Sequence, residues 1–101
     1  MIAVIDNTLS SETAMTRPLD GIRVLDLSRV VAGNMVSLLL ADFGAEVIKV
    51  EAPRGDLTRH SPPHYIDGTS LYFIANNQNK KSVVIDLKSS EGRAVFRELV
   101  R

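Results

Sequence analysis

Basic side chains are the residues whose type and position could serve a ligand. They fall in predicted loops or at the ends of predicted strands, so some could gather around a phosphate-rich molecule at one sheet edge: Arg54, Arg59, Lys80, Lys81 and Lys88. An ordinary solvated surface has the same spacing, and the spacing alone favours that surface. Phosphate binding therefore requires a fold that brings these cations together.

Carboxylates are spread along the chain, but no local pattern pairs any of them with a base: Asp26, Asp42, Asp56 and Asp86. The chain has no cysteine, which excludes disulfides, a thiolate nucleophile and thiolate zinc ligands. A nucleophile with its base and orienting group cannot be assembled from these residues. We therefore predict no catalytic residue in this chain.

His60 and His64 are four residues apart, a spacing that would present both imidazoles to one metal ion if they shared a helix. Pro62 and Pro63 lie between them and rule out that helix. The sequence offers no clear third ligand. We expect two exposed loop histidines and no metal site.

Nucleotide-binding fingerprints are incomplete. A dinucleotide site needs G-x-G-x-x-G directly after the first strand, whereas the loop from Ser28 to Gly33 has one glycine. The G-x-x-x-x-G-K-[ST] loop of nucleoside triphosphate sites is absent. Glu51 ends a predicted strand where a ribose-binding carboxylate would lie, although a solvated carboxylate is common there. A ligand therefore has to be argued from the fold.

The segment from Gly21 to Glu51 predicts a strand, a loop, a helix and a second strand. Ile22 to Leu27 and Glu46 to Val50 are the strands, and the helix between them makes them parallel. Apolar residues at spacings of three and four predict an amphipathic helix, capped by Asn34 and ended by Gly44: Met35, Val36, Leu39, Leu40 and Phe43. The loop from Ser28 to Gly33 then lies at the carboxyl edge of the sheet, where ligands bind and helix N–H groups attract anions.

The remaining segments extend this unit. Residues 1–17 have no sustained period, which predicts a flexible arm, and the Pro- and Gly-rich stretch from Ala52 to Gly68 predicts a long surface loop. A short helix capped by Thr69 or Ser70 precedes a third strand, Ser82 to Leu87.

A final helix, capped by Ser89 or Ser90, has an apolar face of Val95, Phe96, Leu99 and Val100. It stops in mid-pattern at Arg101, from which we expect the chain to be a piece of a longer protein.

Composition narrows the class of protein. Among 101 residues, twelve basic and twelve acidic side chains leave no net charge, so nucleic acid and anionic membrane surfaces are not indicated as partners. We find no signal-peptide core and no stretch of transmembrane length. We therefore expect a soluble, cytoplasmic protein.

Four blocks in unbroken order carry a family resemblance: P-L-D-G-I-R-V-L-D-L-S-R-V-V-A-G, L-L-L-A-D-F-G-A-E-V-I-K-V-E, R-G-D-L-T-R and N-x-N-K-K-S-V-V-I-D-L-K-S-S-E-G-R. Together they resemble the start of the family III CoA-transferases, the group with formyl-CoA transferase and carnitine CoA-transferase. The resemblance covers residues 18–101. It implies the N-terminal part of a Rossmann-like α/β domain with a parallel sheet and flanking helices, in an interlocked homodimer.

The resemblance also implies a reaction. Members move CoA from an acyl-CoA to a carboxylic acid through an aspartyl-CoA intermediate, which is covalent catalysis by a carboxylate. That aspartate lies downstream of the last block, so this chain alone is expected to be inactive. Acyl-CoA and a carboxylic acid are the implied substrates, without a metal.

The CoA contacts that the resemblance places on this sequence lie in three segments: Val31 and Ala32, Arg54, and Ile85, Asp86, Leu87 and Lys88. Arg54 is the candidate to replace an arginine that the formyl-CoA enzyme has directly after its V-E, where this chain has Ala52 and Pro53. A second departure is Asn34, where many members have proline. We expect Asn34 to cap the helix while loosening the loop.

Two other functions stay open. The same blocks resemble α-methylacyl-CoA racemases, which share the fold and the CoA site but move a proton α to the thioester. A self-standing nucleotide-binding module without chemistry is the other alternative. The motifs R-V-V-A-G and N-K-K-S favour the transferase. The sequence does not identify the donor or the acceptor acid.

Overall fold

The computed structural model describes residues 2–6 and 17–101. Its elements follow in this order: β1 Ile2–Asp6, β2 Ile22–Asp26, α1 Ala32–Asp42, β3 Glu46–Glu51, η2 Leu57–His60, β4 Tyr65–Ile66, β5 Thr69–Ser70, α2 Leu71–Asn76, β6 Lys80–Val84 and α3 Ser90–Val100. The main sheet has the order β1-β2-β3-β6, with β2, β3 and β6 parallel. The predicted α/β class is confirmed.

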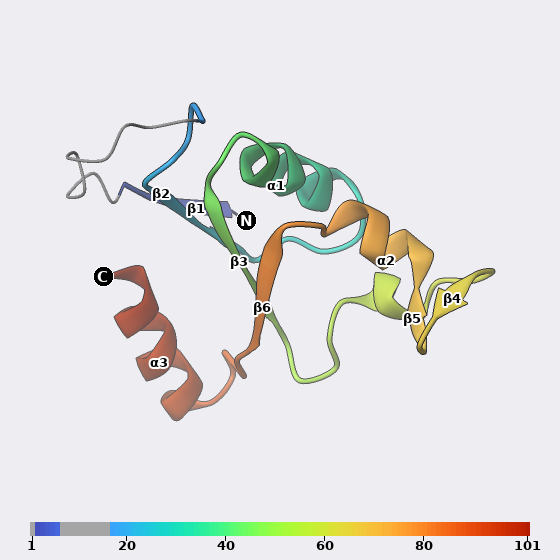
Figure 1. Ribbon diagram of the computed structural model, residues 1–101. Helices are drawn as coiled ribbons and strands as arrows, with labels where there is room; N and C mark the ends of the chain where they lie inside the picture. Colours follow the sequence, from blue (N-terminus) through green and yellow to red (C-terminus); the bar gives the residue numbers. More distant parts are fainter. Residues whose placement is uncertain (1, 7–16) are drawn as a thin grey trace.

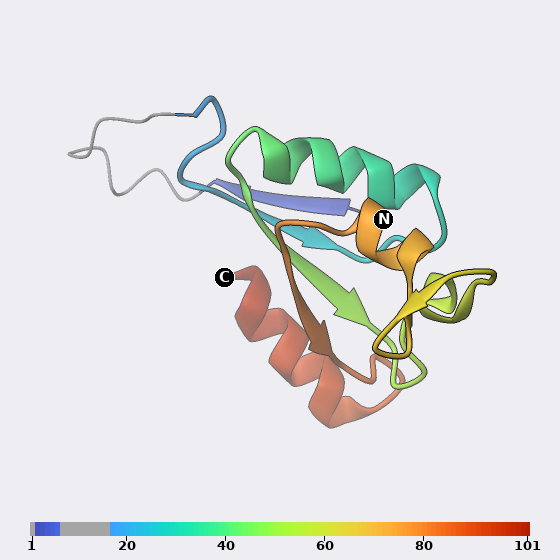
Figure 2. The ribbon, with the colours of Figure 1, turned by 45° about the vertical axis from the view of Figure 1, so that its right-hand side comes forward.

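Helices lie on both sides of the sheet. Figures 1 and 2 show α1 on one side and α3 on the other, and α2 contacts α1 and η2. A buried cluster between α1 and the sheet forms a core: Val24, Ala41, Ala45 and Val47, with Ile2, Leu19, Ile22 and Leu40 packed against it. This packing fixes α1, and with it the loop that precedes α1.

The start of α1 differs from the prediction. The helix begins at Ala32 and its N-cap is Val31, which makes no side-chain cap. The prediction that Asn34 caps the helix is wrong, because Asn34 lies inside the first turn with its side chain fully buried. The end of α1 is as predicted, since Gly44 follows it with a φ of 111°.

The apolar stripe of α1 lies on its outer face in this structure. Met35, Val36, Leu39 and Phe43 are 50–57% exposed, whereas the buried residues of α1 are Asn34, Ser37 and Ala41. Asn34 accepts from Lys49 and Ser37 donates to Asp26, and both partners are buried polar groups of the sheet. The helix is amphipathic as predicted, but here its polar and small face meets the sheet.

The prediction of a flexible arm at residues 1–17 is wrong for Ile2–Asp6, which form β1 antiparallel to β2. Residues 1 and 7–16 lie outside the described part of the chain. The strand β1 lies at the edge of the sheet and is stabilised by its pairing with β2. That pairing depends on residues outside β1, so the sequence of β1 shows no periodic pattern that would predict a strand. Residues 18–21 form a turn, and Gly21 there has a φ of 89°.

Two other boundaries differ. The segment Ala52–Gly68 is not wholly irregular, because Asp56 caps the short helix η2 by accepting a hydrogen bond from Thr58. The strand β6 begins at Lys80, two residues before the predicted start, and ends at Val84. The predicted caps of α2 and α3 are confirmed as Ser70 and Ser89.

Candidate functional site

Three loops meet at the carboxyl edge of the parallel sheet, because β2, β3 and β6 are neighbours that run in the same direction. They are the segment 27–31 before α1, the segment 52–56 after β3 and the segment 85–89 after β6. The sequence-predicted ligand contacts lie in or next to these loops: Val31, Ala32, Arg54, Ile85, Asp86, Leu87 and Lys88. Ligands of open α/β sheets bind at such an edge.

A buried lysine supports the first loop from below. Lys49, on β3, is 1% exposed, and its ammonium donates to the Ser28 carbonyl at 3.1 Å and to Asn34 Oδ1 at 2.7 Å. It also pairs with Asp56 Oδ2 at 2.8 Å. One cation therefore ties the strand β3 to the loops that follow β2 and β3.

A second ion pair lies beside the first. Asp26, at the end of β2, is fully buried, accepts from the backbone and hydroxyl of Ser28 and from the Ser37 hydroxyl, and pairs with Lys80 at 3.3 Å. Lys80 also donates to Asn77 Oδ1 at 2.7 Å. Throughout residues 2–6 and 17–101, every buried side-chain nitrogen and oxygen has a hydrogen-bond partner. Such fully satisfied networks fix one arrangement of the groups they join.

These contacts set the protonation states. Burial alone would raise the pKa of Asp26 and of Asp56, but hydrogen bonds outweigh it and lower both below their usual range. The donors are Ser28 and Ser37 for Asp26, and Lys49, Thr58 and Asn34 for Asp56. Burial lowers the pKa of Lys80 despite the nearby Asp26. The two carboxylates stay charged and serve as supports.

The second loop rests on Glu51. This carboxylate is 4% exposed and takes two hydrogen bonds from Arg59, at 2.8 and 2.7 Å, with further donors in Ser82 and the Asp56 backbone. Arg59, Ser82 and Asp56 together lower the pKa of Glu51 to about 2. The Arg59 guanidinium also lies over the Phe73 ring, 3.9 Å from its centroid. Glu51 is thus committed to an ion pair, not to a ribose, in this structure.

The third loop is closed by backbone contacts. Ile85 is buried and donates to the Glu51 carbonyl at 2.9 Å, whereas Asp86, Leu87 and Lys88 are exposed. Arg93, on α3, donates to the carbonyls of Leu87 and Lys88 at 3.3 and 3.0 Å. The Lys88 side chain therefore stands on a held loop and is free to reach solvent.

Glycine is required near the start of α1 and near the start of α3. A Cβ on Gly33 would lie 2.2 Å from Ser28 Cβ, and a Cβ on Gly92 would lie 1.9 Å from the Asp86 carbonyl oxygen. Both glycines let a helix start approach the loop before it closely. The first and third loops could not keep these shapes with any larger residue there.

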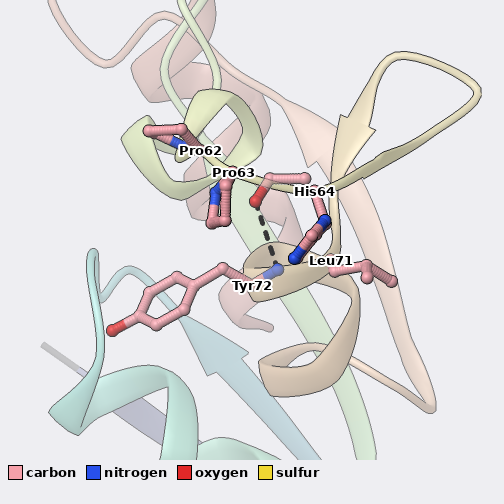
Figure 3. A pocket seen from close by; sticks show the side chains of 6 residues that line it. Pro62, Pro63, His64, Leu71 and Tyr72 are labelled. Atoms are coloured by element: carbon pink, nitrogen blue, oxygen red, sulfur yellow. Dashed lines mark hydrogen bonds between the residues drawn. The ribbon is translucent and has the colours of Figure 1, made fainter.

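A separate pocket of about 230 Å³ lies between the end of η2 and α2, lined by Pro62, Pro63, His64, Ser70, Leu71 and Tyr72. Figure 3 shows the prolines above Tyr72, with the His64 ring next to Leu71. His60 ends η2, and its carbonyl accepts from the Tyr65 hydroxyl at 2.9 Å. Among the described residues, no three acidic, histidine or cysteine side chains come together as a metal site.

The resemblance places its contacts on these three loops, but the sequence pattern does not indicate the side chains that hold the loops. Lys49 and Ser37 have no expected role at the site, and Asn34 is expected there only as a helix cap, whereas all three are buried in the structure. The available signal is Lys49 itself, because a lysine between Ile48 and Val50 in a strand of a parallel sheet requires a partner when it is buried.

Comparisons with known proteins agree with the family resemblance of the sequence. The model of the family described as CoA-transferase family III matches residues 19–101. Succinyl-CoA:glutarate CoA-transferase of Mus musculus is 44% identical over 90 residues, which cover 88% of this chain and 21% of that protein. Formyl-CoA:oxalate CoA-transferase of Streptomyces avermitilis is 45% identical over 87 residues, covering 86% and 21%. The chain thus spans about a fifth of the length of these relatives.

A solved structure shares the fold. The crystal structure of a CAIB/BAIF family protein from Brucella suis aligns with a TM-score of 0.78 at 43% identity, covering 84% of this chain and 24% of that one. No described helix has the length and apolar character needed to cross a bilayer. The resemblance read from the sequence is confirmed. Since the family model spans all but the first 18 residues, the chain belongs to CoA-transferase family III.

Proposed function

We propose that this chain forms the CoA-binding edge of an acyl-CoA:carboxylate CoA-transferase. Its contacts to CoA are the residues on the three loops: Val31, Ala32, Arg54, Ile85, Asp86, Leu87 and Lys88. The observation that carries the proposal is the meeting of these loops at one sheet edge, above a buried network that holds them. The transferase names of the relatives support this chemistry over that of the racemases.

The edge has features suited to a phosphorylated ligand. Val31 leaves the start of α1 without a side-chain cap, so its first N–H groups can meet an anion. Arg54 and Lys88 are exposed cations on the other two loops. Val31, Ala32 and Leu87 add apolar surface, which suits the neutral parts of CoA.

The reaction that we propose for the whole enzyme uses an aspartate outside these 101 residues. Its carboxylate oxygen attacks the thioester carbonyl of the donor, and the C–S bond breaks to give an anhydride and CoA thiolate. The thiolate then attacks the aspartyl carbonyl, which releases the donor acid and leaves an aspartyl-CoA thioester. The acceptor carboxylate takes the CoA by the same two steps in reverse. The chain alone is therefore inactive.

The location and assembly of the enzyme belong to the same proposal. We expect an interlocked homodimer in the cytoplasm, as the family resemblance implies. Analytical ultracentrifugation of the intact protein tests the assembly, and a monomeric mass at micromolar concentration would contradict it.

Lys88→Ala tests the CoA edge. Removing a charged donor should weaken CoA binding by the intact protein about fivefold in calorimetry, with a smaller effect on kcat. Lys81→Ala is the matched control, because Lys81 lies at the opposite end of the strand β6 and pairs with Glu46 at 2.6 Å. Equal CoA affinity in the wild type and Lys88→Ala would remove Lys88 from the site.

A further inference from the structure

The Asn34 side chain joins the first loop to two charged groups. Its amide nitrogen donates to the Val30 carbonyl and to Asp56 Oδ2, the latter at 3.1 Å, and its amide oxygen accepts from Lys49 at 2.7 Å. The Asn34 backbone carbonyl accepts from Lys80 at 2.9 Å. Both amide hydrogens and the amide oxygen are therefore used, in a side chain that is fully buried.

The group that Asn34 holds is strained. Val30 has a φ of 68°, a left-handed conformation that is costly for a β-branched residue. Such a conformation persists only when neighbouring contacts impose it. Ser28 is fixed on one side of Val30 by Asp26 and Lys49, and the Val31 carbonyl is fixed on the other by Met35 N at 2.9 Å. The hydrogen bond from Asn34 to the Val30 carbonyl lies between these two fixed positions.

The consequence falls on the residues that follow Val30. The carbonyl of Val30 belongs to the same planar peptide group as the N–H of Val31, so fixing one orients the other. Val31 and Ala32 come next and are proposed to contact CoA. Lys49 and Asp56, which bond to the Asn34 amide, are 1% and 2% exposed, so solvent does not compete for these bonds.

We propose that Asn34 is a positioning residue for CoA: anchored by Lys49 and Asp56, it holds the Val30 carbonyl and thereby orients Val31 and Ala32 toward the ligand. The inference rests on the proposed function. It also gives Asn34 the opposite role from the predicted one, since Asn34 fixes the loop instead of loosening it.

The test replaces Asn34 in the intact protein. Asn34→Asp keeps the shape and an acceptor for Lys49, but it loses the donors to Val30 and Asp56 and places a carboxylate against that of Asp56. Asn34→Ala removes the amide without adding a charge. In both variants we expect CoA to bind about tenfold more weakly by calorimetry. Hydrogen exchange at Met35, whose N–H bonds to Val31, should quicken relative to exchange in the middle of α1.

Asn77→Ala is the matched control. Asn77 is also a buried asparagine, which donates to the Phe73 carbonyl at 3.0 Å and accepts from Lys80, but neither of these bonds is to the first loop. It should lose stability while its CoA affinity stays within about twofold of the wild type. An equal loss of affinity in Asn77→Ala, or full affinity in both Asn34 variants, would overturn the inference.

A wild type that does not bind CoA would contradict the proposed function and the role of Asn34 toward CoA, and the exchange data would then decide only the hold of Asn34 on the Val30 carbonyl. Faster exchange at Met35 in both Asn34 variants would support it. Unchanged exchange would refute it.

Discussion

The helices α1 and α3 both have eleven residues but are held in different ways. The buried residues of α1 are Asn34, Ser37 and Ala41, whereas no residue of α3 is buried. α1 starts without a side-chain cap, and α3 starts at Ser89, whose hydroxyl accepts from Gly92 N at 2.9 Å. The start of α1 is therefore fixed by the sheet, and the start of α3 by its own sequence.

The difference shows where precision comes from at the edge. The loop before α1 is tied to β2 and β3 through Asp26 and Lys49, so its position follows that of the sheet. The loop before α3 bonds to β3 at its first residue, Ile85, and the rest of it is held by local bonds from Ser89 and Arg93. A ligand that needs exact backbone placement is best served by the first loop. The third loop suits a long, adaptable side chain such as Lys88.

Lys49→Met should disrupt the buried network that holds the start of α1 and cause the largest loss in the free energy of unfolding. It leaves Asp56 buried without its cation, and breaking a buried ion pair costs ~3–5 kcal/mol. Urea denaturation followed by circular dichroism measures the loss. Lys81→Met is the control, because the side chain of Lys81 is 71% exposed and its pair with Glu46 is worth ~1 kcal/mol or less. Similar losses in the two variants would contradict a special role for the buried network.

Acid should lower the stability of the folded chain through Glu51, the last residue of β3. The pKa of Glu51 is about 2 in the folded chain, against 4.5 ordinarily, chiefly because Arg59 bonds to the carboxylate. A lowered pKa means that the stabilisation is complete above pH 4.5 and is lost as the pH falls toward 2. The contribution at neutral pH is on the order of 3 kcal/mol.

Glu51→Gln isolates this contribution. The variant should be less stable than the wild type at pH 7, and the two stabilities should converge as the pH falls toward 2, in urea titrations at each pH. Glu98→Gln is the matched control on α3, because its pair with Arg101 is exposed. A constant difference between Glu51→Gln and the wild type from pH 7 to pH 2 would contradict the ion pair as the cause.

Local chemistry made α3 predictable. Its serine cap and its apolar residues at helical spacing are recognised from neighbouring residues in the sequence. The glycine that ends α1 is recognised in the same way. The parallel order of β2 and β3 also follows from one helix between two strands. The position of the first loop at the carboxyl edge follows from the same argument, whereas the contacts on the other two loops come from the family resemblance.

The network under the first loop depends on residues far apart in the sequence. Asp26 and Lys80 are 54 positions apart, and Asn34 and Asp56 are 22 apart. No local period reports such pairs. The residue type of Asn34 predicts a cap, but the fully buried site gives its amide three partners that a cap position does not offer. Long-range polar contacts overrode the local preference.

Ser89→Ala should produce the smallest effect and sharpen the comparison from the α3 side. It removes the bond to Gly92 N, and loss of a serine cap costs ~1 kcal/mol. Because α3 buries no residue, the change should stay local, as faster hydrogen exchange in the first turn of α3 with unchanged exchange in α1. Ser90→Ala, one residue into the helix, should have little effect on either helix. Faster exchange in α1 on loss of Ser89 would mean that the two helix starts are coupled, and the contrast between a sheet-held and a self-held helix would then fail.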